Sequence, residues 1–150
     1  MESPNKFDLY HWHRALGVLA FVLVIIRLIT RLNANTPPTP VGLPAHEKLG
    51  STLAHWALYG LMFALPLTGY IASSALPEFP GIPPLTSIWF FGLELPLLPI
   101  EKNYDITTWV IGLHYVLGLG FIAVLALHIA GALKHRFFDK PENDVLSRML

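Results

Sequence analysis

Two histidines, His114 and His128, lie fourteen residues apart within a run, Ile106 to Leu133, that has no formally charged residue. In an α-helix, fourteen residues return a side chain to nearly the same face, within about 40°, and about 21 Å further along the axis. Imidazole is also the commonest metal-binding side chain in proteins. Such a helix could offer one ligand near each side of a bilayer, which suits a protein that holds two metal centres in series across a membrane.

The composition is that of a membrane protein. Of 150 residues, 53% are hydrophobic and 13% are charged, whereas a soluble domain usually has about 25% charged residues. The net charge is zero, so nothing indicates a nucleic-acid partner. The absence of cysteine excludes disulfides, iron–sulfur clusters and thiolate zinc sites. The seven histidines are therefore the leading candidates for metal ligands: His11, His13, His46, His55, His114, His128 and His135.

Three segments are long and apolar enough to cross a bilayer core, which needs about 20 residues of helix. They predict an all-α membrane protein whose helices span about residues 10–32, 50–75 and 106–135, in a single transmembrane domain covering 1–150. No pattern of a cleavable signal peptide precedes the first span. The sequence therefore predicts a multi-pass protein embedded in the lipid bilayer.

The segment 77–105 is apolar but too rich in proline to form a continuous helix. Its aromatic run Trp89 to Phe91 suits an interfacial loop folded over the outer mouth of the bundle. A second proline-rich stretch, Thr36 to Pro44, predicts a stiff linker between the first two spans. Lysine and arginine gather on the side of this linker and of the C-terminus, so the positive-inside rule places both in the cytoplasm and the N-terminus outside.

Depth in the membrane sorts four histidines into two layers. His13 and His114 lie toward the outer side, and His55 and His128 lie toward the cytoplasmic side. Zinc usually takes three or four clustered ligands, whereas two facing imidazoles with no nearby carboxylate or thiol fit a six-coordinate haem iron. The sequence therefore predicts His13, His114 and His128 as metal ligands and His55 as a further cofactor-binding residue.

Small and basic residues near these histidines could also contact a haem. Gly17 and Gly118 each follow a layer histidine by four residues, on the same helical face, where a small residue lets a macrocycle approach the backbone. Arg27 either extends its charge to the interface or pairs with a haem propionate on the cytoplasmic side. The sequence favours haem-binding roles for the two glycines and for Arg27.

The remaining histidines are weaker candidates. His11 could replace His13, but it lies half a turn away and further from the bilayer core. His46 lies in a polar loop and His135 in the basic segment after the third span, so solvation explains both better than metal ligation does.

Three strings carry a specific family resemblance: YHWHRALGVLAFVLVIIRLITRL, LAHWALYGLMFALPLTGY, and LHYVLGLGFIAVLALHIAGALKHRFF followed by DVLSRML. They resemble the bacterial cytochrome b561 family over nearly the whole chain, from about Asp8 to Leu150. Members are di-haem b cytochromes of the inner membrane with four helices. They move electrons between quinones and another donor or acceptor, and one characterised type oxidises superoxide and reduces quinone.

The resemblance also implies roles for residues. The three spans resemble helices two, three and four of a four-helix haem-binding bundle, and the family's first helix, which carries a histidine, has no counterpart here. His13 and His114 would take the outer haem, and His128 would share the inner haem with the histidine of that first helix. His55 corresponds to a family histidine on the third helix. Either the inner haem is lost, or His55 substitutes, or a partner chain supplies a ligand; a truncated gene product is a further reading.

The sequence thus predicts a respiratory-chain cytochrome b of the bacterial inner membrane with one or two haem b groups. Its expected substrate is a quinone such as ubiquinone, which would dock near Trp89 and Trp109 at the outer haem edge, and superoxide is a candidate second reactant. A quinone-linked oxidoreductase is one form of this function. The alternative is a membrane-anchor cytochrome b subunit that exchanges electrons with a partner oxidoreductase or a dimer mate. A cofactor-free helical membrane protein is the third possibility.

Overall fold

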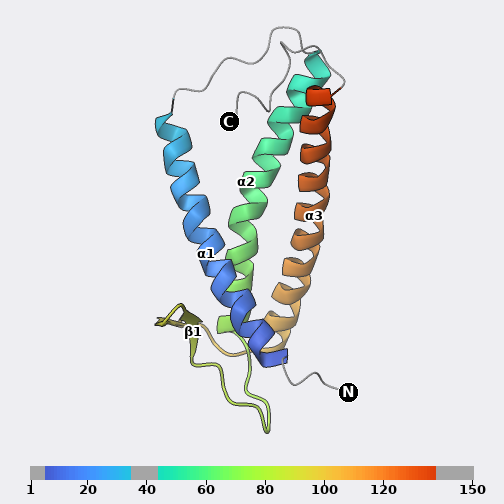
Figure 1. Ribbon diagram of the computed structural model, residues 1–150. Helices are drawn as coiled ribbons and strands as arrows, with labels where there is room; N and C mark the ends of the chain where they lie inside the picture. The colour runs from blue at the N-terminus through green and yellow to red at the C-terminus, as the bar shows by residue number, and fades with distance from the viewer. Residues whose placement is uncertain (1–5, 35–43, 138–150) are drawn as a thin grey trace.

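A computed structural model describes residues 6–34 and 44–137 of the chain. It contains three long helices, α1 (Lys6–Asn33), α2 (Ala45–Ser74) and α3 (Tyr104–Phe137), as Figure 1 shows. All three are long and apolar enough to cross a membrane. The three predicted spans lie almost entirely within them, and the all-α membrane class is confirmed. Residues 35–43, which include most of the proposed proline-rich linker, and residues 138–150 lie outside the described residues.

The helices are arranged around α2. Helices α2 and α3 run side by side, and α1 packs against α2 near the end of the molecule that carries the loop between α2 and α3 (Figure 1). Toward its other end α1 diverges from α2 (Figure 1). Among the described residues, no Cα atom of α1 lies within 8 Å of a Cα atom of α3. A side chain that joins α1 to α3 must therefore reach across a gap between the two backbones.

The helices bury very little of their own apolar surface. In an apolar 18-residue stretch of each helix, the share of residues that the rest of the chain buries is 11% for α1, 17% for α2 and 0% for α3. A helix that is hydrophobic on every side and uncovered by its own chain is suited to contact lipid. This pattern agrees with helices that pack loosely with one another in a bilayer.

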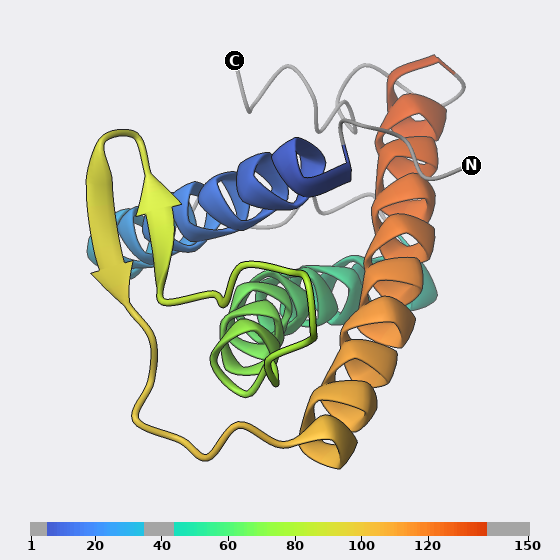
Figure 2. The ribbon, with the colours of Figure 1, turned by 90° about the horizontal axis from the view of Figure 1, so that it is seen from below.

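The loop between α2 and α3 contains a β-hairpin that the sequence analysis did not anticipate. Strands β1 (Ser87–Phe90) and β2 (Leu93–Pro96) pair in antiparallel fashion around the two-residue turn Phe91–Gly92. Both turn residues have positive φ, 47° and 96°, as a type I′ turn requires. Seen from below, the hairpin lies beside α1 on the side away from α3 (Figure 2), so it packs on the flank of the bundle.

Hydrogen bonds at the end of α2 fix where α3 begins. The carbonyl of Ala75 accepts hydrogen bonds from the Asn103 amide at 2.9 Å and the Thr107 hydroxyl at 2.8 Å. The Ser74 hydroxyl accepts one from the Leu98 amide at 3.0 Å. Asn103 also caps α3, because its side-chain oxygen accepts from the amides of the next turn at 2.9 and 3.1 Å. These hydrogen bonds join the two ends of the long loop, residues 75–103, and so set the register of α3 against α2, and with it the depth of the α3 histidines.

Candidate functional site

The first histidine pair joins α1 to α3. The rings of His13 and His114 have their centroids 5.8 Å apart, and their planes are perpendicular at 90°. Two imidazoles that bind one metal ion from opposite sides, each at a metal–nitrogen distance of about 2 Å, have ring centres about 6 Å apart. The observed separation is close to that value. These two side chains are thus the groups that reach across the gap between the α1 and α3 backbones.

Helix α2 contacts the far side of the His114 ring. The Nδ1 atom of His114 lies 3.0 Å from the Leu65 carbonyl oxygen and 3.0 Å from the Thr68 hydroxyl. A carbonyl can only accept, so Nδ1 carries the proton and donates it. The Nε2 atom then keeps a free lone pair, which is the form of imidazole that binds a metal. This tautomer fits an axial ligand.

The second histidine pair joins α2 to α3. The ring centroids of His55 and His128 are 5.0 Å apart, with an angle of 64° between the planes. Both helices pack closely here, so these rings are nearer to each other than the about 6 Å of a metal-bridged pair. A haem between them would require α2 and α3 to separate. The inner pair therefore fits a haem less well than the outer pair does.

The described residues hold no cluster suited to zinc or a similar ion. No group of three or more histidine, aspartate, glutamate or cysteine side chains in residues 6–34 and 44–137 is arranged so that it could hold a metal ion. A zinc site takes three or four such ligands, whereas haem iron takes its four equatorial bonds from the porphyrin and needs only two axial ligands from the protein. The donor set of two histidines per layer therefore fits haem.

Gly17 and Gly118 were predicted to let a haem approach the helix backbone, but the packing of the chain itself does not require glycine at either position. A methyl group added at Gly17 would meet no atom within 4 Å, and one added at Gly118 would only touch the Leu65 side chain at 3.9 Å. Open space therefore lies beside Gly17, one turn from His13.

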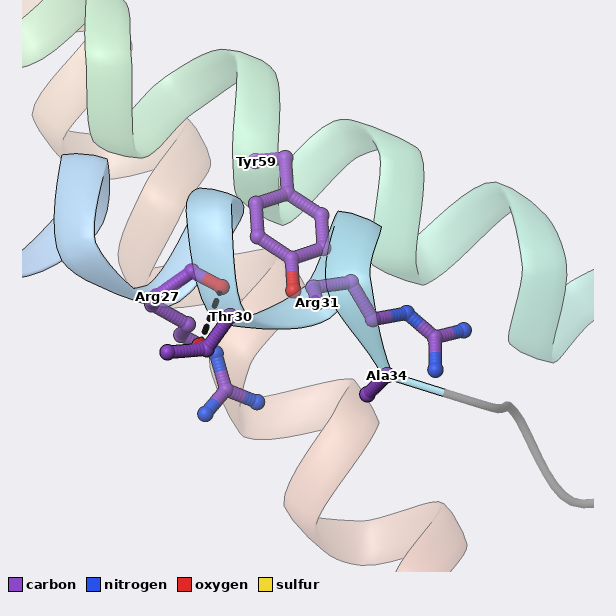
Figure 3. A pocket seen from close by; sticks show the side chains of 5 residues that line it. All are labelled: Arg27, Thr30, Arg31, Ala34 and Tyr59. Atoms are coloured by element: carbon purple, nitrogen blue, oxygen red, sulfur yellow. Dashed lines mark hydrogen bonds between the residues drawn. The ribbon is translucent and has the colours of Figure 1, made fainter.

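Arg27 lines a cavity of about 200 Å³ between α1 and α2, together with four other residues: Thr30, Arg31, Ala34 and Tyr59. Figure 3 shows Tyr59 of α2 pointing toward the arginines of α1. In the described part of the chain, no carboxylate lies within ion-pair distance of either guanidinium. His55 is within the electrostatic reach of both arginines. The cavity thus holds two positive charges and lies near the inner layer of histidines.

The remaining candidates belong to neither histidine pair. His11 precedes His13 by two residues on α1, and both side chains are exposed. His46 and His135 both lie near the Glu47 carboxylate, at 4.0 and 3.9 Å, and Lys134 also pairs with it. These two histidines belong to an ionic cluster that ties the start of α2 to the end of α3.

The two tryptophans expected near a quinone lie in different surroundings. Trp89 packs edge-on against Trp12 of α1, with centroids 5.5 Å apart, and against Phe91 at 5.7 Å. Trp109 of α3 is 81% exposed. Trp89 thus belongs to an aromatic cluster with Trp12, the residue that precedes His13 in the chain, whereas Trp109 is exposed.

Thr68 and Gly69 were missed as site residues by the sequence analysis. A methyl group at Gly69 would come within 3.2 Å of the His114 ring. In the sequence, the string ALPLTGY that contains both residues indicates only the family resemblance. Its contact with a histidine 46 residues further along the chain depends on how the helices pair.

The fold and the histidines define the class: a multi-pass helical membrane protein with histidine pairs at two depths between its helices. The comparisons with known proteins agree. The family model for the prokaryotic cytochrome b561 matches residues 1–150. This chain therefore belongs to the prokaryotic cytochrome b561 family of membrane electron-transfer proteins, and the predicted family is confirmed.

Two curated relatives are similar over most of their length. "Cytochrome b561 homolog 2" of Escherichia coli (strain K12) is 30% identical over 141 residues, which cover 92% of this chain and 68% of the relative. "Probable superoxide oxidase CybB" of Yersinia pestis is 30% identical over 140 residues, which cover 92% of this chain and 72% of the relative. Membership of the family implies a b-type haem and a place in the bacterial inner membrane.

Proposed function

We propose that this protein is an electron-transfer cytochrome in which His13 and His114 are the axial ligands of one haem b, and which exchanges electrons with a membrane quinone. The observation that carries the proposal is the 5.8 Å separation of the two imidazoles from helices whose backbones stay apart. The proton on His114 Nδ1 and the open space beside Gly17 add support.

Haem b, when bound, supplies an iron that takes up and releases one electron. The residues of this chain position and insulate that centre. His13 and His114 would hold the haem, and they would set its ligand type and its depth in the membrane. The apolar faces of α1 and α3 exclude water, and a low dielectric around the centre is one of the factors that set its potential.

The aromatic cluster at the outer end is the proposed docking place for the quinone ring. Trp12 precedes His13 in the chain and packs against Trp89 of the hairpin. Aromatic rings stack favourably on one another, and Trp12 adjoins the outer ligand in the chain. Because one curated relative is named a probable superoxide oxidase, superoxide is our proposed second reactant, with the protein then acting as a quinone-linked oxidoreductase.

The inner layer is proposed as a second, conditional haem site with His128 as its ligand. Because the His55 ring lies only 5.0 Å away on a packed helix, we favour a second ligand from a partner chain. Arg27 would then pair with a propionate of that haem, since its cavity holds two guanidinium groups near His55 with which no carboxylate of the described residues pairs.

The test begins with protein expressed with a haem precursor and purified in mild detergent. Anaerobic addition of a short-chain ubiquinol should reduce the bound haem, and His114→Ala, which lacks the outer ligand, should lose this reduction. Trp89→Leu should keep its haem content and react more slowly with quinol. A preparation without haem would overturn the proposal. Reduction by a co-purifying dehydrogenase, and not by quinol, would favour the membrane-anchor alternative.

A further inference from the structure

The His114 ring is held by one turn of α2, and we infer that this turn, through Thr68, Gly69 and the Leu65 carbonyl, is a positioning element that fixes the ligand's tautomer and tunes the outer haem. The inference rests on the proposed function, because it assumes that His114 is an axial ligand. The three residues lie at positions i, i+3 and i+4 and therefore share one face of the helix.

The hydroxyl of Thr68 is poised to accept the histidine proton. Its own hydrogen is used within the helix, since it lies 2.8 Å from the Ala64 carbonyl and 2.9 Å from the Leu65 carbonyl. The lone pairs of the oxygen are thus free to accept from His114 Nδ1, which lies 3.0 Å away. Together with the Leu65 carbonyl, also at 3.0 Å, the Nδ1 proton has two acceptors, so protonation at Nδ1 is strongly favoured over protonation at Nε2.

Gly69 supplies the space that this arrangement needs. An added methyl group would lie 3.2 Å from Cε1 and 3.5 Å from Nδ1 of His114. The ring would then have to move by a few tenths of an ångström, away from the two oxygen atoms that hold it. Only glycine lets the ring approach the backbone of α2 this closely.

The proposed consequence is electronic as well as steric. An imidazole that binds iron through Nε2 and donates its Nδ1 proton to a good acceptor is a more basic ligand. A more basic ligand favours ferric over ferrous iron. The positioning element should therefore hold the potential of the outer haem below the value it would have with a freely rotating histidine.

The decisive comparison is between Thr68→Val, which removes the hydroxyl at nearly constant volume, and Thr68→Ser, which keeps it. Potentiometric titration of the reduced haem band should give a higher midpoint potential for Thr68→Val than for the wild type, and a midpoint near the wild-type value for Thr68→Ser. Loss of the outer haem in Thr68→Val alone would support the same conclusion. Equal behaviour of the two variants, whether both match the wild type or both depart from it, would overturn the inference.

Gly69→Ala tests the steric part, with Gly60→Ala as the matched control on the same helix, because a methyl group at Gly60 meets no atom within 4 Å. Gly69→Ala should change the potential or the low-spin spectrum of the ferric haem, and Gly60→Ala should not. If the two variants have the same potential and spectrum, Gly69 has no positioning role.

The outcomes separate this inference from the proposed function. If the wild type binds no haem, the proposed function itself is wrong. If the wild type binds haem that His114→Ala removes, but the Thr68 and Gly69 variants all retain wild-type potentials, the ligand assignment stands and only the positioning element is refuted.

Discussion

At the scale of residues, the function depends on imidazoles that reach a common point from separate helices. His13 and His114 do so with a ring separation of 5.8 Å. His11 lies two residues before His13 on the same helix, and both of these side chains are exposed, so exposure does not distinguish them. A difference of two positions rotates a helical side chain by about 200°. Ligand candidates on one helix can therefore be separated by face as well as by residue type.

Replacing His114 with alanine should remove the outer haem, because His13 would lose the imidazole that faces it. The haem-to-protein ratio from a pyridine haemochrome assay should fall by one haem per chain. His11→Ala is the matched control and should leave the ratio unchanged. An unaltered ratio in His114→Ala would refute the assignment.

The inner layer is tested by His55→Ala and His128→Ala in the same assay. Because the two rings are only 5.0 Å apart on packed helices, we expect His55→Ala to leave the haem count unchanged. If the wild type holds two haems, His128→Ala should lower the count by one. Loss of one haem in both variants would show that His55 is the second ligand after all.

At the scale of elements, the connection between α2 and α3 controls the depth of the α3 histidines. The end of α2 binds the start of α3 through the Ala75 carbonyl, and Asn103 caps α3. The predicted interfacial loop is an ordered hairpin with a defined turn, so this connection is more regular than its proline content suggests.

Asn103→Ala should destabilise the fold by about 1 kcal/mol, because the first amides of α3 lose their side-chain acceptor. The expected result is a lower midpoint of thermal unfolding for the detergent-solubilised protein. Asn103→Asp keeps an oxygen acceptor at the cap and should unfold near the wild-type temperature. Identical midpoints for Asn103→Ala and the wild type would contradict a capping role.

At the scale of the whole molecule, the bundle exposes apolar surface on nearly every side and carries an ionic cluster around Glu47 at one end, with the hairpin at the other. Lysine and arginine are more frequent on the side of the Glu47 cluster. The positive-inside rule therefore places that side in the cytoplasm.

The orientation can be measured directly because the chain has no cysteine. In spheroplasts, a membrane-impermeant maleimide should label Pro83→Cys, in the loop before the hairpin, without lysis. His46→Cys, at the opposite end and exposed, should react only after lysis. The reverse pattern would invert the proposed orientation and leave the fold intact.

Much of this protein could be predicted from its sequence, because hydropathy, charge and residue type act locally along a helix. Three apolar runs were enough to predict the spans, and the spacing of His114 and His128 on one helix indicated two layers of ligands. The resemblance of the chain to the cytochrome b561 family followed from contiguous strings, which is why it was confirmed without reference to the structure.

Tertiary structure decided the features that depend on contacts between distant segments. Only the pairing of α2 with α3 brings Thr68 and Gly69 to His114. Only the packing of α1 on α2, with none of the described Cα atoms of α1 within 8 Å of α3, separates the backbones of the outer ligands. The Phe91–Gly92 turn and the Arg27 cavity likewise depend on backbone geometry that proline content and charge do not specify. Residue type sets which side chains can bind a haem, and helix packing sets which of them can meet.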